Sequence, residues 1–177
     1  YSNTSGSNNV AIGAAALFAN TASENTAVGR YCLDANTSGG NNVGVGYNVL
    51  GANTTGGQNT AVGHTALDAN TDGTENTAMG YGALGATTSG HSNTAVGEAA
   101  LDANTTGNAN VAVGRDALGA NTTASNNTAV GLNALLVSTT ASENTAVGHS
   151  AGDAVTTGTH NVMIGYLAGT SAIDITT

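Results

Sequence analysis

A short pattern of apolar and polar residues recurs along almost the whole chain. The unit reads N-[T/V]-A-V-G-x-x-A-L-x-A-N-T-[T/S]-G-x-x, and a glycine after the first apolar stretch marks each of ten units. Successive marker glycines are 17 residues apart, with one spacing of 16. A fixed period of this length predicts a solenoid in which each unit forms one coil. The marker residues are Gly13, Gly29, Gly46, Gly63, Gly80, Gly97, Gly114, Gly131, Gly148 and Gly165.

Each unit predicts two short strand-like segments and one turn. N-T-A-V-G and A-L-x-A-N-T have the residues of strands, and T-T-G-x-x has those of a turn. A helix is not predicted, because Gly and Asn recur too often and no capped stretch has a 3.6-residue period. The sequence therefore predicts an all-β fold, a parallel β-solenoid (β-roll or β-helix) of about ten 17-residue coils. We expect the repetitive solenoid over residues 1–169, and a divergent C-terminal end, or the start of a cap or next element, over residues 170–177.

An asparagine stands four residues before every marker glycine. Identical amides stacked about 4.8 Å apart can hydrogen-bond to one another along a stack of strands. Because Asn is otherwise depleted in strands, its recurrence favours a structural ladder at a corner of the coils over Asn-rich loops. A second Asn column begins at Asn3 and lapses at Ser138 and Val155. The predicted ladder consists of Asn9, Asn25, Asn42, Asn59, Asn76, Asn93, Asn110, Asn127, Asn144 and Asn161.

Both faces of the first strand are apolar. We expect the Val, Ile or Met before each marker glycine to meet the Leu column of the A-L segment inside the coil. The opposite face is never polar in ten units, although a water-facing strand normally alternates. It is therefore predicted to pack against an identical chain; a crowded inside corner of the coil is the alternative. The predicted subunit contact is Ala11, Ala27, Gly44, Ala61, Ala78, Ala95, Ala112, Ala129, Ala146 and Met163.

Composition and charge narrow the functional classes. The formal net charge is −9, and the only basic residues besides His are two arginines, so a nucleic-acid partner is not expected. No run of about 18 apolar residues occurs, so membrane insertion is not expected either. Aromatic residues make up 3% of the chain, which excludes a core of large side chains.

Histidines do not form a predicted metal site. His64 and His149 share a repeat position but stand five coils, about 24 Å, apart. His91 and His160 fall in turns. A zinc site needs three or four converging ligands, so no metal ligand is assigned.

The remaining reactive side chains also lack a catalytic arrangement. Asp34, Asp68 and Asp102 recur every second coil, which predicts carboxylates about 10 Å apart on a solvated surface. Cys32 occupies an Ala position and is expected to be a small buried hydrophobe. We therefore expect no catalytic residue, no cofactor and no enzymatic activity.

The repeat itself resembles those of known proteins. N-T-A-V-G-x-x-A-L-x-A-N-T-T-G resembles repeats of bacteriophage tail-fibre proteins, and its N-[T/V]-A-V-G core is similar, more distantly, to the head repeats of YadA-like trimeric autotransporter adhesins. The resemblance implies a homotrimeric structural shaft or attachment module, extracellular, on a virion tail fibre or a bacterial cell surface. It implies identical chains as partners and a host-surface receptor or glycan bound through flanking regions. The period departs from the adhesin repeats, which are usually shorter.

The repeat leaves two functions open besides that of a structural fibre segment. The alternative is an ice- or surface-binding solenoid that presents ranks of Thr at the turn. A third is glycan binding along the shaft by Tyr31, Tyr47, Tyr81 and Tyr166. The Thr rank is Thr21, Thr37, Thr54, Thr71, Thr88, Thr105, Thr122, Thr139 and Thr156.

Overall fold

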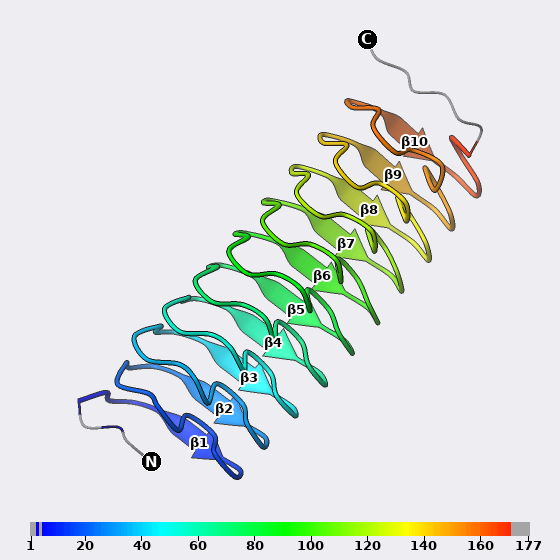
Figure 1. Ribbon diagram of the computed structural model, residues 1–177. Coiled ribbons are helices and arrows are strands. Elements are labelled where there is room, and N and C mark those ends of the chain that lie inside the picture. The colour runs from blue at the N-terminus through cyan, green and yellow to red at the C-terminus, as the bar shows by residue number, and fades with distance from the viewer. Residues whose placement is uncertain (1–2, 4, 171–177) are drawn as a thin grey trace.

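The computed structural model describes residue 3 and residues 5–170, and in this part the chain winds into a stack of coils (Figure 1). Each strand pairs in parallel with the strand of the next coil, so the single ten-stranded sheet follows the chain order. The prediction of an all-β parallel solenoid is confirmed. The predicted divergent end, 170–177, lies outside the described residues except for Thr170. The strands are β1 (Val10–Ile12), β2 (Thr26–Val28), β3 (Val43–Val45), β4 (Thr60–Val62), β5 (Thr77–Met79), β6 (Thr94–Val96), β7 (Val111–Val113), β8 (Thr128–Val130), β9 (Thr145–Val147) and β10 (Val162–Ile164).

Each coil contains one strand, and the prediction of a second strand over A-L-x-A-N-T is wrong. Residues two and four positions after the marker glycine have left-handed backbone angles, such as φ 58° at Tyr31 and 53° at Leu33. Such angles are uncommon for bulky residues. Here they are stabilised by bonds to both neighbouring coils, because Tyr31 N–H donates to Ala14 and Leu33 N–H donates to Val49, both at 3.0 Å. The segment is therefore a tight turn that still belongs to the stack.

Marker glycines end the strands because no side chain fits there. Gly148 has φ 135°, and a Cβ added to it would stand 2.5 Å from the carbonyl oxygen of Gly165 in the next coil. Both the backbone angle and this close approach require glycine. The same relation recurs from coil to coil, which explains the strict spacing seen in the sequence.

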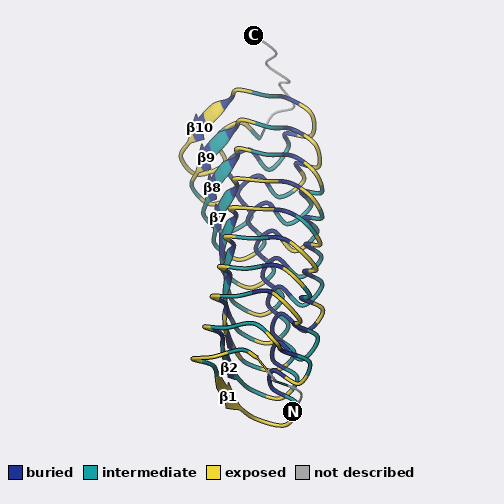
Figure 2. Ribbon diagram, turned by 90° about the vertical axis from the view of Figure 1, so that its left-hand side faces the viewer, coloured by how far each residue is buried: buried dark blue, intermediate teal, exposed yellow. Residues whose placement is uncertain are grey.

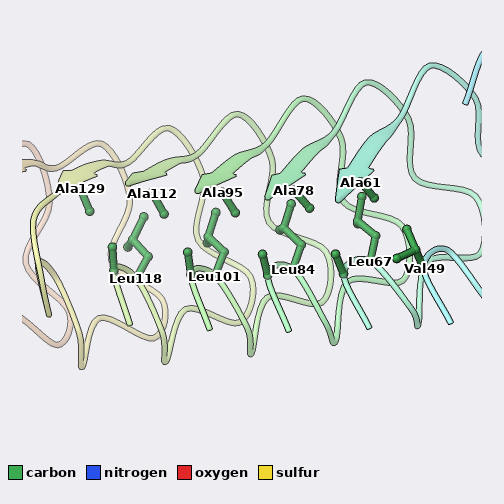
Figure 3. Packing of buried hydrophobic residues seen from close by; sticks show 14 of the residues in the cluster. Val49, Ala61, Leu67, Ala78, Leu84, Ala95, Leu101, Ala112, Leu118 and Ala129 are labelled. Carbon is green, nitrogen blue, oxygen red and sulfur yellow. The ribbon is translucent and has the colours of Figure 1, made fainter. Parts of the chain in front are cut away.

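A thin core runs along the inside of the coils. The middle residue of each strand, usually Ala, faces the Leu of the turn segment, as at Ala95 and Leu101 (Figure 3). Figure 2 shows buried positions stacked along the inside, whereas β1 is exposed throughout and β10 is exposed at its first and third residues. In each of these coils the Leu, the residue before it and the middle residue of the strand, such as Leu101, Ala100 and Ala95, are thus enough to exclude water from the interior.

Candidate interaction surface

The Ala column predicted as a subunit contact lies inside the coil instead, and this prediction is corrected. Ala27, Ala61 and Ala95 are fully buried within a single chain, so no second chain can reach their side chains. The physical reason is volume. The Leu column projects toward the strand and leaves room only for a small residue opposite. The inside-corner alternative therefore describes these positions better than the subunit contact does. The column comprises Ala11, Ala27, Gly44, Ala61, Ala78, Ala95, Ala112, Ala129, Ala146 and Met163.

The outward face of the sheet consists of the first and third residues of every strand, and we call it the outer sheet face. None of its twenty side chains is charged. Val45 is 36% exposed and Met79 is 45% exposed, so the face is open to solvent along its length. The prediction that the Val, Ile or Met before each marker glycine meets the Leu column inside the coil is therefore wrong. Neither strand face is charged, and periodicity alone does not show which face is buried. The face comprises Val10, Ile12, Thr26, Val28, Val43, Val45, Thr60, Val62, Thr77, Met79, Thr94, Val96, Val111, Val113, Thr128, Val130, Thr145, Val147, Val162 and Ile164.

Two sets of threonines differ in what their hydroxyl groups do. In the turn rank from Thr21 to Thr122, each hydroxyl donates to a carbonyl oxygen of the next coil, at 2.8–3.3 Å. These donors are therefore already used. On the outer sheet face, Thr77 and Thr94 make no side-chain hydrogen bond within the described part of the chain. The unused hydroxyls thus lie on the strands rather than at the turn where the sequence placed the Thr rank.

The first Asn column ties every coil to the next. Each Oδ1 accepts a hydrogen bond from the backbone N–H of the following column member, at 2.9–3.0 Å throughout. From Asn9 to Asn144, each Nδ2 donates to a carbonyl oxygen of the next coil, as Asn93 does to Gly107 at 2.9 Å. Direct amide-to-amide bonds add to this at some coils, such as Asn110 to Asn93 at 3.2 Å. The column thus bonds mainly from side chain to backbone.

The second Asn column forms direct amide-to-amide bonds and breaks where Asn is absent. Asn70 Nδ2 donates to Asn53 Oδ1 at 2.7 Å, and Asn53 donates in turn to Asn36. The next coil carries Thr87, which has no amide donor, and the buried Oδ1 of Asn70 is left without a partner.

The same defect recurs at the next break. Ser138 follows Asn121, and the Oδ1 of Asn121 is the second buried acceptor without a partner among the described residues. A buried unpaired acceptor costs about 1–3 kcal/mol, so each interruption is a local weakness.

Aromatic rings form a row beside the sheet. His64 stacks between Tyr47 and Tyr81, with ring centroids 5.0 and 5.3 Å apart, and Tyr31 meets Tyr47 edge-on. Stacked rings cover one another's faces and present their edges to solvent. A sugar platform needs an open ring face, which the stack denies to His64, whereas Tyr81 stacks on one side only among the described rings and is 61% exposed. Tyr166 stacks likewise on His149.

The carboxylates of Asp68 and Asp102 are closer together than the spacing of two coils predicts. Asp102 Oδ1 lies 2.8 Å, and Asp68 Oδ1 3.7 Å, from the point where a Cβ on Gly85 would stand. The glycine thus gives both carboxylates room to approach each other. Partial burial raises the pKa of Asp68, and the nearby Asp102 carboxylate adds to this rise. Burial also raises the pKa of Asp34 and of Asp102, the latter with a contribution from Asp116.

Reactive chemistry is not assembled in the described coils. Burial raises the pKa of the Cys32 thiol to about 12, so it stays neutral and packs as an apolar side chain. Within the described residues, no three His, Cys, Asp or Glu side chains are grouped so that they could hold a metal ion. The same residues contain no helix that is both long and apolar enough to span a membrane.

Comparison with known proteins finds no matching family model, no curated relative and no similar solved structure.

Proposed function

We propose that this chain is a non-enzymatic structural segment, a shaft or attachment module, of a phage tail fibre or cell-surface adhesin, and that it works outside the cell as a homotrimer. The uninterrupted repetition of one coil supports this best. The marker glycine and the Asn bonds recur from β1 to β10, and the Leu of the core recurs in the first eight coils, from Leu17 to Leu135. A regular stack of this kind serves as a spacer, since its length is set by the number of coils.

Several kinds of contact join each coil to the next, as a rigid rod requires. Ten strands at the usual spacing give a length of roughly 45 Å. Each junction between coils is held by the parallel strand bonds, by an Asn side chain and by the Leu–Ala core together. Repeat proteins draw their stability from such nearest-neighbour interfaces.

Lateral assembly in this proposal uses the outer sheet face rather than the Ala column. Six of its twenty residues are Thr, the rest are Val, Ile or Met, and none is charged. A largely apolar, uncharged surface of this extent is typical of protein contacts. Three chains that meet along this face would bury it around a shared axis, and receptor or glycan recognition would fall to flanking regions.

Particle mass tests the proposal directly. Native mass spectrometry or light scattering is expected to give three chains per particle. Val96→Glu, on the outer sheet face, is expected to dissociate the particle, because it buries a charge at the contact. Thr106→Glu, at an exposed turn, is the matched control and is expected to leave the mass unchanged. A folded single chain at micromolar concentration would rule the assembly out.

An ice- or surface-binding function is the second candidate, and one observation favours it. The unused Thr77 and Thr94 hydroxyls stand beside Val and Met methyl groups in a regular array, about 4.8 Å apart along the stack. A regular, uncharged array of this kind suits an ordered solid surface. If the particle is a single chain, Thr77→Lys should abolish inhibition of ice recrystallisation while Thr106→Glu retains it. The absence of such inhibition in the parent protein would exclude ice binding.

A further inference from the structure

Tyr81 ends a row of stacked rings with one of its faces open. Its ring is nearly parallel to that of His64, with centroids 5.3 Å apart, and His64 stacks in turn on Tyr47 at 5.0 Å. Among the described rings, only His64 stacks on Tyr81, which is 61% exposed. The row therefore presents the flat face of an aromatic ring to solvent in the middle of the stack.

The next coil brings a carboxylate to this open face. Ala99 N–H donates to the Tyr81 carbonyl at 2.9 Å, so the chain at Glu98 and Ala99 passes beside Tyr81 on the side away from His64. Glu98 has the repeat position of Tyr81 one coil further on, and it is exposed. A carboxylate does not continue an aromatic stack, but it pairs with a positive group that lies on the ring.

Space for such a group lies next to the ring. Gly82 follows Tyr81 at a position where every other coil carries a side chain. A Cβ on Gly82 would have only Asp102 Oδ1 within 4 Å, at 3.7 Å. The site is therefore open and has a second carboxylate at its edge. Burial and the Asp116 carboxylate raise the pKa of Asp102, so a positive charge placed there would stabilise its charged form.

The chain already contains one contact of the required kind. The Arg30 guanidinium lies 4.5 Å over the Tyr31 ring, and its Nη2 donates to the Tyr31 hydroxyl at 2.9 Å. A guanidinium is planar, so it stacks on an aromatic face while its N–H fork pairs with a carboxylate. A compact ammonium group does not combine the two contacts in this way. The open face and the nearby carboxylates thus suit a guanidinium best.

The arginines of the chain itself are already engaged. Arg30 is held on Tyr31, and Arg115 Nε lies 3.2 Å from Asp116 Oδ2. The chain contains no other arginine and no lysine. A second copy therefore has no free guanidinium to place on Tyr81, and the formal net charge of −9 favours a partner with a basic surface.

We propose that the open face of Tyr81, together with Glu98 and Asp102, binds an arginine side chain of a different protein. The guanidinium would extend the row beyond Tyr81 and donate hydrogen bonds to Glu98, with the Asp102 carboxylate at the edge of the site. This is a binding function of the shaft itself, whereas the function proposed above leaves recognition to flanking regions.

A pair of short peptides tests the site. Acetyl-Gly-Arg-Gly-amide is added to the whole chain at an ionic strength of about 0.15 M, and NMR follows the ring protons of the tyrosines. We expect saturable shifts at Tyr81 and nuclear Overhauser effects between its ring and the arginine side chain. The matching lysine peptide is expected to bind at least about threefold more weakly. Unchanged Tyr81 signals, or equal affinity for the two peptides, would overturn the proposal.

Three single variants separate a built site from general attraction to an acidic chain. Tyr81→Leu removes the ring and Glu98→Gln removes the charge, and each is expected to weaken binding at least about fivefold. Glu75→Gln is the matched control, because Glu75 is also exposed but lies on the other side of β5. It is expected to change the affinity less than about twofold. Equal losses in Glu75→Gln and Glu98→Gln would show a response to net charge alone and overturn the site.

Two further variants test the place and the source of the ligand. Gly82→Leu keeps the ring and both carboxylates and fits the backbone, since Leu167 has φ 56° at the same repeat position and Gly82 has 64°. It is expected to block binding, and parent-like affinity would place the ligand elsewhere. Arg30→Gln combined with Arg115→Gln is expected to bind the peptide as the parent does. A clear gain in affinity would show that arginines of other copies occupy the site, and would overturn the assignment to a different protein.

Discussion

The interior coils and the last two coils fill the same core by opposite means. In the interior, a Leu from the turn segment faces a small strand residue, as Leu101 and Ala95 do. In the last two coils the Leu is replaced by Gly152 and Gly169, and in β10 Met163 replaces the strand Ala, whereas β9 keeps Ala146. A Cβ on Gly152 would lie 2.9 Å from the Met163 Cε. The total volume across the coil is therefore kept while the large side chain changes sides, as tolerated core exchanges require.

A smaller exchange of the same kind occurs near the other end. Gly44 replaces the strand Ala of its coil, and Val49 and Cys32 replace neighbouring Ala residues. A Cβ on Gly44 would stand 2.5 Å from Cys32 Sγ and 3.4 Å from Val49 Cγ1. The larger neighbours thus occupy the space that the glycine leaves.

Polar positions do not allow such exchange. Thr87 and Ser138 are smaller than Asn, and no neighbour supplies the missing amide, so Asn70 and Asn121 each keep an unpaired acceptor. Apolar contact is non-directional, whereas a hydrogen bond needs a donor at one place. This solenoid therefore tolerates substitution in its core more readily than in its amide ladders.

The largest effect should come from a charge placed in an interior coil. Ala95→Glu buries a carboxylate opposite Leu101, and we expect a loss of at least about 4 kcal/mol of unfolding free energy. Ala11→Glu, at the same repeat position in the exposed first coil, should cost less than about 1 kcal/mol. Urea unfolding followed by circular dichroism measures both. Equal midpoints would mean that the middle strand residue faces outward after all.

Removal of an interior ladder residue should come next. Asn93→Ala leaves the Asn110 N–H without its acceptor and removes one of the two amide donors to the Gly107 carbonyl, and we expect a cost of about 1–3 kcal/mol. Asn9→Ala should cost less, because end coils open more easily. Thermal unfolding of the two variants side by side makes the test. Equal and negligible shifts in melting temperature would show that the Asn ladder does not contribute to the stability of the fold.

Placing the Leu of the interior coils at Gly152 should overpack the core near the C-terminal end of the stack. Gly152→Leu fits the backbone, since the column's other Leu residues share its left-handed φ, but the side chain would collide with Met163. We expect a loss of about 1–3 kcal/mol. Adding Met163→Ala should recover most of it, so that a double-mutant cycle gives a favourable coupling. Additive effects would show that the two side chains do not share one space.

Repair of the second ladder should stabilise the chain. Thr87→Asn supplies an amide donor to Asn70 Oδ1, and Ser138→Asn supplies one to Asn121 Oδ1. Each is expected to add about 1 kcal/mol. Thr55→Asn, at an exposed turn, is the control and should change nothing measurable. A lower melting temperature in both repaired variants would contradict the account of the two unpaired acceptors.

The smallest effect concerns pH. Because burial raises the pKa of Asp68 and Asp102, the folded chain binds these protons more tightly than the unfolded chain. The contribution of these two groups to stability therefore rises as pH falls from neutrality through their raised pKa values. Asp68→Asn combined with Asp102→Asn should flatten this rise. Melting curves of both proteins between pH 7 and about pH 4 provide the measurement, and parallel pH profiles would count against the assignment.

Much of the candidate surface could not be predicted from the sequence, for a physical reason. Alternation tells the two faces of a strand apart when one is polar, but here Ala95 on one face and Val96 on the other are both apolar. Only the length of the Leu101 side chain, which fills the space behind Ala95, decides that Ala faces inward. Left-handed turns at Leu residues were missed because bulky residues rarely adopt them.

The sequence by itself determined the period, the solenoid, the marker glycines and the positions of the Asn columns, because each depends on a residue type with one local property. Glycine alone accepts the close approach between coils, and recurrence at 17 residues places equal side chains above one another. The tertiary structure decided which apolar face is buried, that each coil has one strand, and that the turn Thr hydroxyls are already bonded. These depend on volumes and bond directions between coils, which exist only once neighbouring coils have stacked.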